Sequence, residues 1–349
     1  MIESATPTVS VIIVNYNGRG VLTNALEAVF NTTYPNFEVL VIDNHSNDNS
    51  DVDAERLFGA RKNFKMVRLN SNIKYSGANN AGFAHSSNRA KYLAFLNNDT
   101  RVKENWLSEI IRTMENDPSI GALQPVIMRM KNPREIDSSG FLMTPFGEIM
   151  PAKFHPPIIR EVFYAIGAAI IVPRRVFATL GGFRPYFKDC CEETDLCWRI
   201  WLRGLRVVCL PKKLAYHWRG WTLRREYGSQ GSPPELLTRF KLDMILLNYS
   251  LRNIICKVPI AILGELIKAL GSAAKASLRG DARATVWALR TLVGIVLLVF
   301  DLPYVVRNRA LVQTKIRTVS DEALLARAFV RPTAIPMVFW GINSDLQLQ

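Results

Sequence analysis

Short runs of β-branched residues alternate with helical patterns through the first hundred residues, and this alternation restricts the fold more than any other feature. Such an order of elements is typical of a mainly parallel sheet covered by helices. The runs predict strands at Val9–Val14, Phe37–Ile42, Lys65–Leu69 and Lys91–Leu96. Helices are predicted between them at Val21–Phe30, Val52–Phe58 and Ala78–Asn88. We therefore expect a nucleotide-binding α/β architecture, in which ligands collect at the carboxyl ends of the strands.

Three of the predicted strands end in clusters of polar residues. The clusters are Asn15, Tyr16, Asn17 and Gly18 after the first strand, Asp43, Asn44 and His45 after the second, and Asn97, Asn98 and Asp99 after the fourth. Turn chemistry explains any single cluster, because Asn, Asp and Gly favour turns for backbone reasons. Three clusters at the same edge of one sheet favour a binding site at that edge.

Two further segments bear on ligand binding. Asn72–Gly82 opens a helix with amide side chains and glycine, and backbone N–H groups at such a start bind phosphate readily. Its glycine pattern is neither a Walker loop nor a dinucleotide fingerprint, which argues against ATP hydrolysis and against NAD. The less regular stretch Met128–Pro157, rich in Pro, Gly and Ser, is either an acceptor loop or a long connection.

A carboxylate at a strand end is a candidate metal ligand. Asp99 follows the apolar strand and can hold a hard divalent cation that also binds a diphosphate, because Mg²⁺ prefers few protein ligands plus substrate oxygens. His217, which follows a strand predicted at Arg206–Leu210, is a second candidate ligand. A lone histidine is more often structural, so this pair alone is weak support for a metal.

Three acidic residues, Glu192, Glu193 and Asp195, begin a helix predicted at Glu192–Arg203. Acidic residues are ordinary at helix starts. Apolar neighbours would partly desolvate these carboxylates, however, and desolvation raises a carboxyl pKa toward that of a general base. Basic residues accumulate after them and create a field suited to an anionic substrate. These are Arg199, Arg203, Arg206, Lys212, Lys213, Arg219, Arg224 and Arg225.

Net charge and apolar helices are both concentrated toward the C-terminus. The 349 residues carry a formal net charge of +14, and 48% of them are hydrophobic, which excludes a disordered chain. Residues 230–349 carry half of this charge on a third of the length. Composition alone leaves nucleic acid, an anionic membrane or a phosphorylated substrate as partners. Apolar helices with Lys or Arg on one side are predicted at Arg239–Ile255, Pro259–Leu278 and Ala282–Val306.

The C-terminal helices favour a membrane surface over a membrane span. Their longest uncharged run, Thr291–Phe300, has ten residues and lies between Arg290 and Asp301. A transmembrane helix needs roughly 20 apolar residues, so a simple span is not favoured. An amphipathic helix in the headgroup region tolerates such charges. Suitable interfacial residues are Trp287, Tyr304, Arg307 and Arg309. The alternative is a soluble helical subdomain that caps the sheet.

The cysteines and the N-terminus indicate a cytoplasmic catalytic part. The chain has five cysteines, four of them within Cys190–Cys209, and no pair has the spacing of a zinc knuckle. We interpret them as reduced thiols. Met1–Ser10 has no basic region, and the apolar run that follows is too short for a signal peptide.

Taken together, these strings resemble family 2 glycosyltransferases of the GT-A fold, the group that includes rhamnosyltransferase-like enzymes. The resemblance runs from Val9 to about Trp221 and keeps the order of the family's motifs. The matching segments are VSVIIVNYNG at 9–18, VIDNHSNDNS at 41–50, residues 72–82, LNNDT at 96–100, residues 167–172 and 181–183, EETDLCWR at 192–199, and residues 216–217.

The resemblance implies a role for each matching position. Residues implied in donor binding are Asn15, Tyr16, Asn17, Asp43, Asn44, Asn72, Asn79, Asn80 and Asn98. Asp99 matches the last residue of the DxD-type metal motif, with Asn97 at its first position, and His217 matches the later metal-binding histidine. A divalent cation, Mg²⁺ or Mn²⁺, is therefore expected. Glu193 falls where the family places the aspartate of its Glu-Asp pair, the catalytic base.

Several positions depart from the family pattern. Asn97 replaces the first acid of the metal motif, so metal affinity rests on fewer charges. Lys74 and Arg184 stand where a glycine and an aspartate are common, and each either contacts the donor diphosphate or is a surface substitution. Glu193 in place of aspartate lengthens the base by one methylene, which shifts the acceptor hydroxyl.

The resulting prediction is a GT-A catalytic domain at residues 1–230, with a mainly parallel nucleotide-binding sheet flanked by helices, and a helical, membrane-associating region at residues 231–349. The predicted reaction is inverting transfer of a sugar from a nucleoside diphosphate sugar to a hydroxyl of a glycan or lipid-linked acceptor, at the inner face of the cell membrane. Glu193 is the predicted base. Glu192 is the less favoured base, and Asp195 is expected to orient the loop or to bind the acceptor.

Two other classes of protein are weighed against this prediction. A nucleotidyltransferase would share the strand-end site but is expected to carry a Gly-rich loop with Lys or Arg after the first strand, where this chain has Asn15–Gly18. A nucleic-acid binder is suggested by the +14 charge. The basic residues do not interleave with aromatic residues in a recognisable module, so no nucleic-acid partner is expected.

Overall fold

The computed structural model describes residues 6–152, 157–188, 190–218, 233–279, 282–327 and 329–331. The chain forms two compact units. Unit 1 consists of Met1–Phe141, Pro151–Trp201 and Leu205–Glu226, and unit 2 consists of Leu142–Met150, Leu202–Gly204 and Tyr227–Gln349. Unit 2 thus takes the short segment Leu142–Met150 from within the range that the sequence assigns to the catalytic domain.

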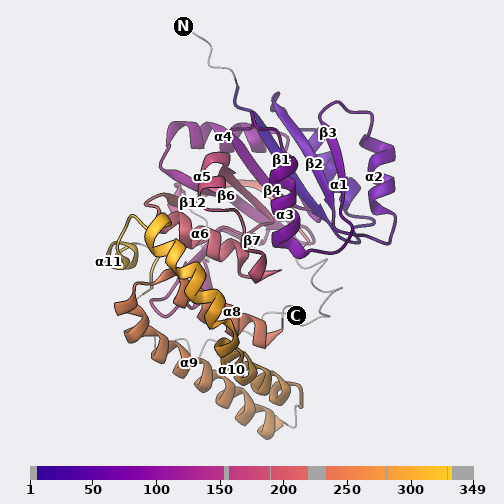
Figure 1. Cartoon of the computed structure of the whole chain (residues 1–349). Helices are drawn as coiled ribbons and strands as arrows, with labels where there is room; N and C mark the ends of the chain where they lie inside the picture. The colour runs from indigo at the N-terminus through magenta and orange to yellow at the C-terminus, as the bar shows by residue number, and fades with distance from the viewer. Residues whose placement is uncertain are drawn as a thin grey trace. The chain divides into compact units, whose positions relative to one another are not determined.

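Unit 1 is built on one large mixed sheet (Figure 1). Its strands are β1 Val9–Asn15, β2 Phe37–Asp43, β3 Phe64–Arg68, β4 Tyr92–Asn97, β5 Thr100–Val102, β6 Ile120–Arg129, β7 Ile136–Ser138, β10 Arg160–Glu161, β11 Ala169–Pro173 and β12 Arg206–His217. Their order is β10-β12-β6-β11-β4-β1-β2-β3, with β5 beside β12 and β7 beside β6. β8 Phe141–Met143 and β9 Ile149–Pro151 form a separate two-stranded sheet.

The helices of unit 1 follow the strands as the sequence predicts. They are α1 Leu22–Phe30, α2 Ser50–Phe58, α3 Lys74–His85, α4 Trp106–Asn116, α5 Arg174–Thr179 and α6 Glu192–Leu202. β4, β1, β2 and β3 are parallel neighbours, so their carboxyl ends meet at one edge. The prediction of a mainly parallel sheet at this end of unit 1 is confirmed, and so are the four strands on which it rests.

Two boundaries and one missed strand differ from the prediction. α3 begins at Lys74 rather than Ala78, because the Asn72 side chain accepts from the Lys74 N–H at 2.9 Å and starts the helix early. β12 continues past Leu210 to His217, since a register shift against β6 accommodates Pro211. The strand β6 was not predicted, although nearly all of it is buried in the middle of the sheet.

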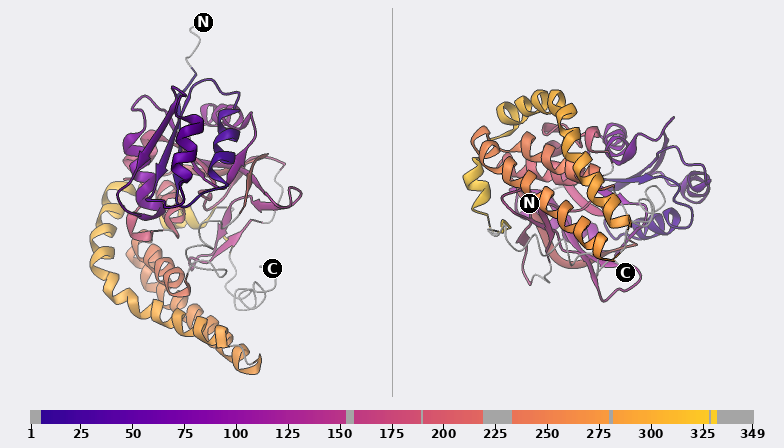
Figure 2. Two further views of the ribbon diagram at one scale, coloured as in Figure 1. Left: turned by 90° about the vertical axis from the view of Figure 1, so that its right-hand side faces the viewer. Right: turned by 90° about the horizontal axis from the view of Figure 1, so that it is seen from below.

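Unit 2 is helical apart from its short segments, and its long helices lie side by side (Figures 1 and 2). Its elements are α8 Pro234–Asn248, α9 Leu251–Arg279, α10 Ala282–Leu311, η2 Val312–Ile316 and α11 Asp321–Leu325. The predicted helix boundary before Pro259 is wrong, because α9 runs through this proline. A proline removes one helical hydrogen bond, but α9 continues since Ala261, Glu265 and Ala269 beyond it are buried.

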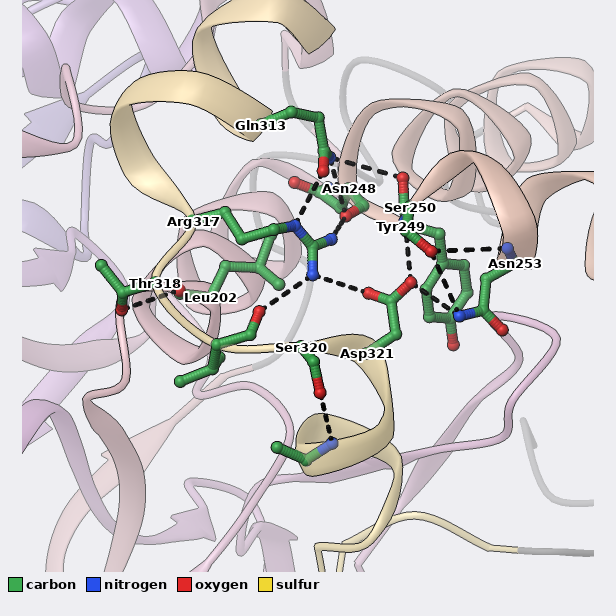
Figure 3. A network of polar contacts seen from close by, with 12 residues as sticks. Leu202, Asn248, Tyr249, Ser250, Asn253, Gln313, Arg317, Thr318, Ser320 and Asp321 are labelled. Carbon is green, nitrogen blue, oxygen red and sulfur yellow. Dashed lines mark hydrogen bonds and ion pairs between the residues drawn. The ribbon is translucent and has the colours of Figure 1, made fainter.

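The helical structure is interrupted instead between α8 and α9, where a polar network binds the carbonyl groups at the end of α8 (Figure 3). Gln313 Nε2 donates to the carbonyl oxygens of Leu247, Asn248 and Tyr249 at 3.2–3.3 Å. Arg317 also donates to the Asn248 carbonyl and pairs with Asp321 at 2.8 Å. Carbonyl groups at a helix end have no partner within the helix, so this network fixes where α8 ends.

Among the described residues, one helical stretch, Thr285–Ile316, is long and apolar enough by length and composition to cross a membrane. The sequence argument disfavoured a span because Arg290 and Asp301 interrupt the uncharged run. Both charges are paired with residues of α8, Arg290 with Glu235 at 2.5 Å and Asp301 with Arg239. The apolar stretch is therefore longer than the uncharged run. The core helix of a soluble protein can be equally long and apolar, so length and composition alone do not place this helix in a membrane.

Candidate active site

The carboxyl ends of β1, β2 and β4 meet around Asn15. Asn15 aligns with Asp43 across the β1–β2 pair, and its neighbour Val14 aligns with Asn97 across the β1–β4 pair. The Asn15 side-chain amide donates to Asp43 Oδ1 at 2.9 Å and to Ser50 Oγ at 2.8 Å. The predicted clustering of the strand-end residues is thus present, and Asn15 holds the first two strand ends together.

Gly18 allows the third strand end to join this cluster. Asn98 Nδ2 donates to Asn15 Oδ1 at 3.1 Å. A Cβ atom on Gly18 would lie 2.5 Å from Asn98 Nδ2 and closer still to Asn15 Oδ1. Only glycine leaves room for this contact between the two amides. Tyr16 and Asn17 lie half-buried in the same loop, where Asn17 Oδ1 accepts from the Asn47 N–H at 2.9 Å.

Several backbone N–H groups at the start of α3, where a phosphate is predicted to bind, donate hydrogen bonds to other residues of the protein. Asn44 Nδ2 donates to Asn72 Oδ1 at 2.8 Å, and Asn44 Oδ1 accepts from the Ile73 N–H at 2.9 Å. The Lys74 N–H is taken by Asn72, and the Ser76 N–H by the Lys188 carbonyl at 3.0 Å. The prediction that the first N–H groups of this helix bind a phosphate is therefore wrong for these three groups.

The two asparagines inside α3 also make structural contacts. Asn80 donates to the Phe183 carbonyl at 2.7 Å and accepts from the Phe183 N–H at 3.0 Å, so both ends of its amide bind one backbone segment. Asn79 is buried and donates to the Tyr75 carbonyl at 3.0 Å. Asn80 therefore fixes the loop that precedes α6, and Asn79 braces its own helix.

A histidine held between two carboxylates lies at the end of β12. His217 Nε2 is 3.2 Å from Asp99 Oδ1, and His217 Nδ1 is 2.8 Å from Asp137 Oδ2. The Asn97 amide lies 3.5 Å from the same Nε2. Burial acts to lower the pKa of His217, but Asp99 and Asp137 outweigh it and raise that pKa to about 10. The three predicted metal residues are thus brought together from β4, the turn after it and β12.

This arrangement fits a divalent cation with few protein ligands. Asp137 binds the Nδ1 side of His217 and thereby directs Nε2 toward Asp99, the pattern seen around metal-binding histidines. A carboxylate oxygen suits Mn²⁺ or Mg²⁺, whose remaining positions a diphosphate can fill, and an imidazole nitrogen favours a transition metal such as Mn²⁺ over Mg²⁺. Within the described residues, no group of three or more His, Cys, Asp or Glu side chains is arranged as a complete metal site. The protein would supply only part of the coordination shell.

The predicted base, Glu193, lies at the start of α6 against a glycine loop. Its Oε1 accepts from the Gly167 N–H at 2.8 Å. The Tyr75 hydroxyl donates to the Gly167 carbonyl at 3.3 Å, so one peptide segment links the phenol to the carboxylate. Burial raises the pKa of Glu193 above its usual value, although the Gly167 N–H acts in the opposite direction. Burial and then Glu193 raise the pKa of Tyr75 well above the usual value.

The other two acidic residues of α6 face inward. Asp195 is fully buried and pairs with Arg199 at 2.7 Å and with Arg184. Arg199 also donates to the Leu180 and Gly182 carbonyls at 2.6 and 2.9 Å. Asp195 thus fits the loop-orienting role and not acceptor binding, and Arg184 pairs with Asp195 rather than lying on the open surface. Glu192 is buried beside Glu193.

Strand pairing brings the base and the metal pair to one site. β11 pairs with β4, and the Asn97 N–H donates to the Ala168 carbonyl at 3.4 Å, directly after the glycine that holds Glu193. Burial raises the pKa of Tyr75 most, and the nearby charges of Glu193 and Asp99 both raise it further. Neither Tyr75 nor Asp137 is predicted as a site residue from the sequence. Tyr75 lies within the motif at 72–82, whereas Asp137 lies in the irregular stretch after β6, where no periodicity marks it.

Comparison with known proteins agrees with this geometry. Residues 10–181 match the family model for glycosyl transferase family 2. Residues 10–181 of the chain belong to this family. The chain is 28% identical over 226 residues to the O-antigen biosynthesis protein RfbC of Myxococcus xanthus, a match that covers 61% of the chain and 17% of RfbC. The chain spans 17% to 36% of the lengths of the first three curated relatives that it matches.

Solved glycosyltransferases share the fold of the chain. S. aureus TarS 1-349 superimposes with a TM-score of 0.57 at 15% identity, and the match covers 88% of this chain and 87% of that one. The mannosyltransferase PcManGT from Pyrobaculum calidifontis, solved with GDP-Man and Mn²⁺, gives a TM-score of 0.53 at 16% identity and covers 85% of this chain and 88% of that one. The catalytic fold is GT-A, as predicted.

Proposed function

We propose that the protein is an inverting glycosyltransferase that moves a sugar from a nucleoside diphosphate sugar to a hydroxyl of a glycan or lipid-linked acceptor. The observation that carries this proposal is the geometry around Glu193. A partly desolvated carboxylate is held by the Gly167 N–H in the same site as the Asp99–His217 pair. The names of the relatives support the class, since RfbC acts in O-antigen biosynthesis and PcManGT was solved with GDP-Man.

The strand-end cluster would receive the nucleotide. Asp43 accepts from the Asn15 amide and from the Ser46 N–H at 3.0 Å, which fixes the carboxylate at the edge of the sheet where the nucleotide would lie. A carboxylate held in this way can accept from a base N–H or a ribose hydroxyl. The amides around it keep the loops in place before the donor arrives.

Asp99 and His217, with the Asn97 amide beside them, would hold a divalent cation. Such an ion neutralises the charge that develops on a departing diphosphate. Asp137 would keep the His217 ring oriented with Nε2 toward Asp99. His217 would hold a metal only as neutral imidazole, so it would have to give up the proton that the two carboxylates stabilise.

Glu193 would act as the general base. Its carboxylate takes the proton of the acceptor hydroxyl while the acceptor oxygen forms a bond to the anomeric carbon of the sugar. The bond from that carbon to the diphosphate oxygen breaks on the opposite face, and the electron pair leaves with the diphosphate. A single displacement of this kind inverts the anomeric configuration. The raised pKa of Glu193 suits proton transfer near neutral pH.

The place of the reaction is part of the same proposal. We place it on the cytoplasmic side of a membrane, where lipid-linked saccharides are available. The support is the long apolar helix at Thr285–Ile316 together with the basic character of the C-terminal third.

A thermal-shift screen of nucleotide sugars with and without Mn²⁺ tests the proposal. One donor is expected to raise the melting temperature in the presence of Mn²⁺, and the increase is expected to disappear in Asp99→Ala. Transfer from that donor to candidate acceptors is then measured, with the anomeric configuration of the product read by NMR. Retention of configuration, or full donor binding by Asp99→Ala, contradicts the mechanism.

A further inference from the structure

Exposed apolar side chains are concentrated on two helices of unit 2. Among the described residues, 18 of the 25 large hydrophobic side chains that are exposed lie on α9 and α10. The most exposed are Leu278, Phe300, Leu270 and the pair Ile255 and Val306. Only 22% of the most apolar window of α10 is buried, so this helix is not an ordinary core helix. Concentration on two adjacent helices marks a surface rather than scattered exposure.

These residues form a stripe on each helix. On α10, the exposed positions Val286, Leu289, Val293, Val296 and Phe300 recur every three or four residues, which places them on one face. On α9, the corresponding positions are Leu263, Ile267 and Leu270. α9 and α10 are consecutive helices that pack against each other. We call the exposed apolar sides of these two helices the outer face of the hairpin.

Two charged residues of α10 pair with residues of α8. Asp301 of α10 is buried and pairs with Arg239 of α8. Arg290 of α10 pairs with Glu235 of α8 at 2.5 Å. From residue 258 to 274 of α9 and from 291 to 306 of α10, no charged side chain is exposed. Over these two ranges the outer face therefore carries no exposed charge, and the exposed Arg290 lies just before the second of them.

A second buried cluster completes this inward arrangement. Glu265 of α9 is buried and pairs with Lys241 of α8, and Lys268 lies 3.0 Å from the same carboxylate. Glu148, from the segment that joins unit 2, pairs with both lysines. A water-soluble bundle usually places its charges outside and its large apolar side chains inside. Here the ion pairs lie between the helices and the apolar side chains face outward, as in proteins that contact lipid.

Basic residues mark one end of the hairpin. Arg252 near the start of α9 is exposed, and so are Arg307 and Lys315 near the end of α10 and just beyond it. Because α9 ends at Arg279, α10 begins at Ala282 and the two helices pack against each other, the start of α9 and the end of α10 lie at the same end of the hairpin. An uncharged apolar face next to exposed basic residues complements hydrocarbon beside anionic headgroups.

We propose that the outer face of α9 and α10 inserts into one leaflet of a lipid bilayer and holds the protein on the membrane surface without crossing it. A crossing α10 would carry its partners Glu235 and Arg239 of α8 into the hydrocarbon, where charged side chains are costly. With the hairpin lying along the surface, α8 stays on the aqueous side and its ion pairs remain intact. This inference concerns anchoring and does not depend on the transfer reaction.

Co-sedimentation of the full chain with vesicles tests the proposal. The wild type is expected to sediment with phosphatidylcholine vesicles that contain phosphatidylglycerol, and to a smaller extent with phosphatidylcholine alone. Sedimentation is expected to persist in 1 M NaCl, because salt screens charges but does not weaken apolar insertion. The double variant Val296→Glu/Phe300→Glu is expected to partition at least tenfold less. The matched control is Val52→Glu/Leu57→Glu on α2, whose side chains are similarly exposed, and it is expected to behave as wild type.

Three results overturn the proposal. The wild type could remain in the supernatant with both kinds of vesicle, or salt could release it completely, which would reduce the contact to surface charge. A dimer that Val296→Glu/Phe300→Glu dissociates, with no vesicle binding by the wild type, would assign the face to a second copy of the chain. Circular dichroism confirms that each variant is folded before its binding is measured.

Discussion

Substitution of Gly167 by alanine tests the link between the glycine loop and the base. A Cβ atom at this position would lie 2.5 Å from Glu193 Oε1 and closer still to the Tyr75 hydroxyl oxygen, whereas ordinary contact begins near 3.4 Å. The carboxylate must therefore move by about 1 Å and give up its hydrogen bond to the Gly167 N–H. A displacement of about 1 Å in a catalytic group costs roughly 100-fold in rate.

The expected result is a split between the kinetic constants. In Gly167→Ala, kcat falls roughly 100-fold while KM for the donor stays within about twofold, because the donor contacts are elsewhere in the site. The Gly167 N–H lowers the pKa of Glu193, so its loss raises that pKa further. Since the base must be ionised, the acid limb of the kcat profile is expected to move to higher pH. The assay is release of nucleoside diphosphate from the donor that the thermal-shift screen identifies.

The control is Gly271→Ala on α9, where a Cβ atom would meet no heavy atom within 4 Å. It is expected to keep wild-type kinetics and the same melting temperature or a slightly higher one, because alanine favours the helix. A Gly167→Ala variant that folds and keeps both its kcat and its acid limb would refute the assignment of Glu193 as the base held by this loop.

Three further substitutions separate chemistry, metal binding and stability. Glu193→Gln is expected to reduce the rate of transfer by roughly 100-fold or more and to keep its stabilisation by the donor. This variant is also expected to melt at a higher temperature than the wild type at pH 8 but not at pH 4, because a carboxyl group with a raised pKa destabilises the fold when it ionises. Asp137→Asn is expected to weaken Mn²⁺ binding, measured by titration calorimetry, about 10- to 100-fold. The control Glu135→Gln, at an exposed position, is expected to keep the Mn²⁺ affinity of the wild type. Asp195→Asn leaves buried Arg199 without its carboxylate and is expected to cost about 3–5 kcal/mol in urea unfolding; a loss below about 1 kcal/mol would contradict the role of this pair.

Periodicity and strand-end chemistry predicted the parallel part of the sheet well. β1, β2 and β4 are mostly apolar and end in Asn or Asp, so the residues that predict each strand adjoin the polar residue at its end. β6 was missed because Gly121, Gln124 and Pro125 interrupt its pattern. Those residues are tolerated because both neighbouring strands cover it, which a single sequence does not display.

Some residues of the candidate site are marked by local sequence motifs, and others are not. Asp99, His217 and Glu193 could be proposed from the sequence because they occupy motif positions next to clearly predicted strands and helices. Asp137 acts on His217 from 80 residues away, and only the pairing of β7 with β6 brings it there. Local patterns cannot report such a contact. Tyr75 was within a recognised motif, but its relation to Glu193 depends on where the Gly167 loop lies.

The asparagines of the motifs are predicted to border the donor, and in the structure many of their amide groups also bind other parts of the protein. Asn15 contacts Asp43, Ser50 and Asn98, Asn80 uses both ends of its amide on Phe183, and Asn44 pairs with Asn72. Amides suit this task because one side chain both donates and accepts without adding charge. They link strand ends and loops while leaving the electrostatic field of the site to a few carboxylates. The motif therefore specifies a rigid frame. Under the proposed function, the chemistry would depend on two charged groups with shifted pKa values: His217 between Asp99 and Asp137, and Glu193 beside the Gly167 N–H.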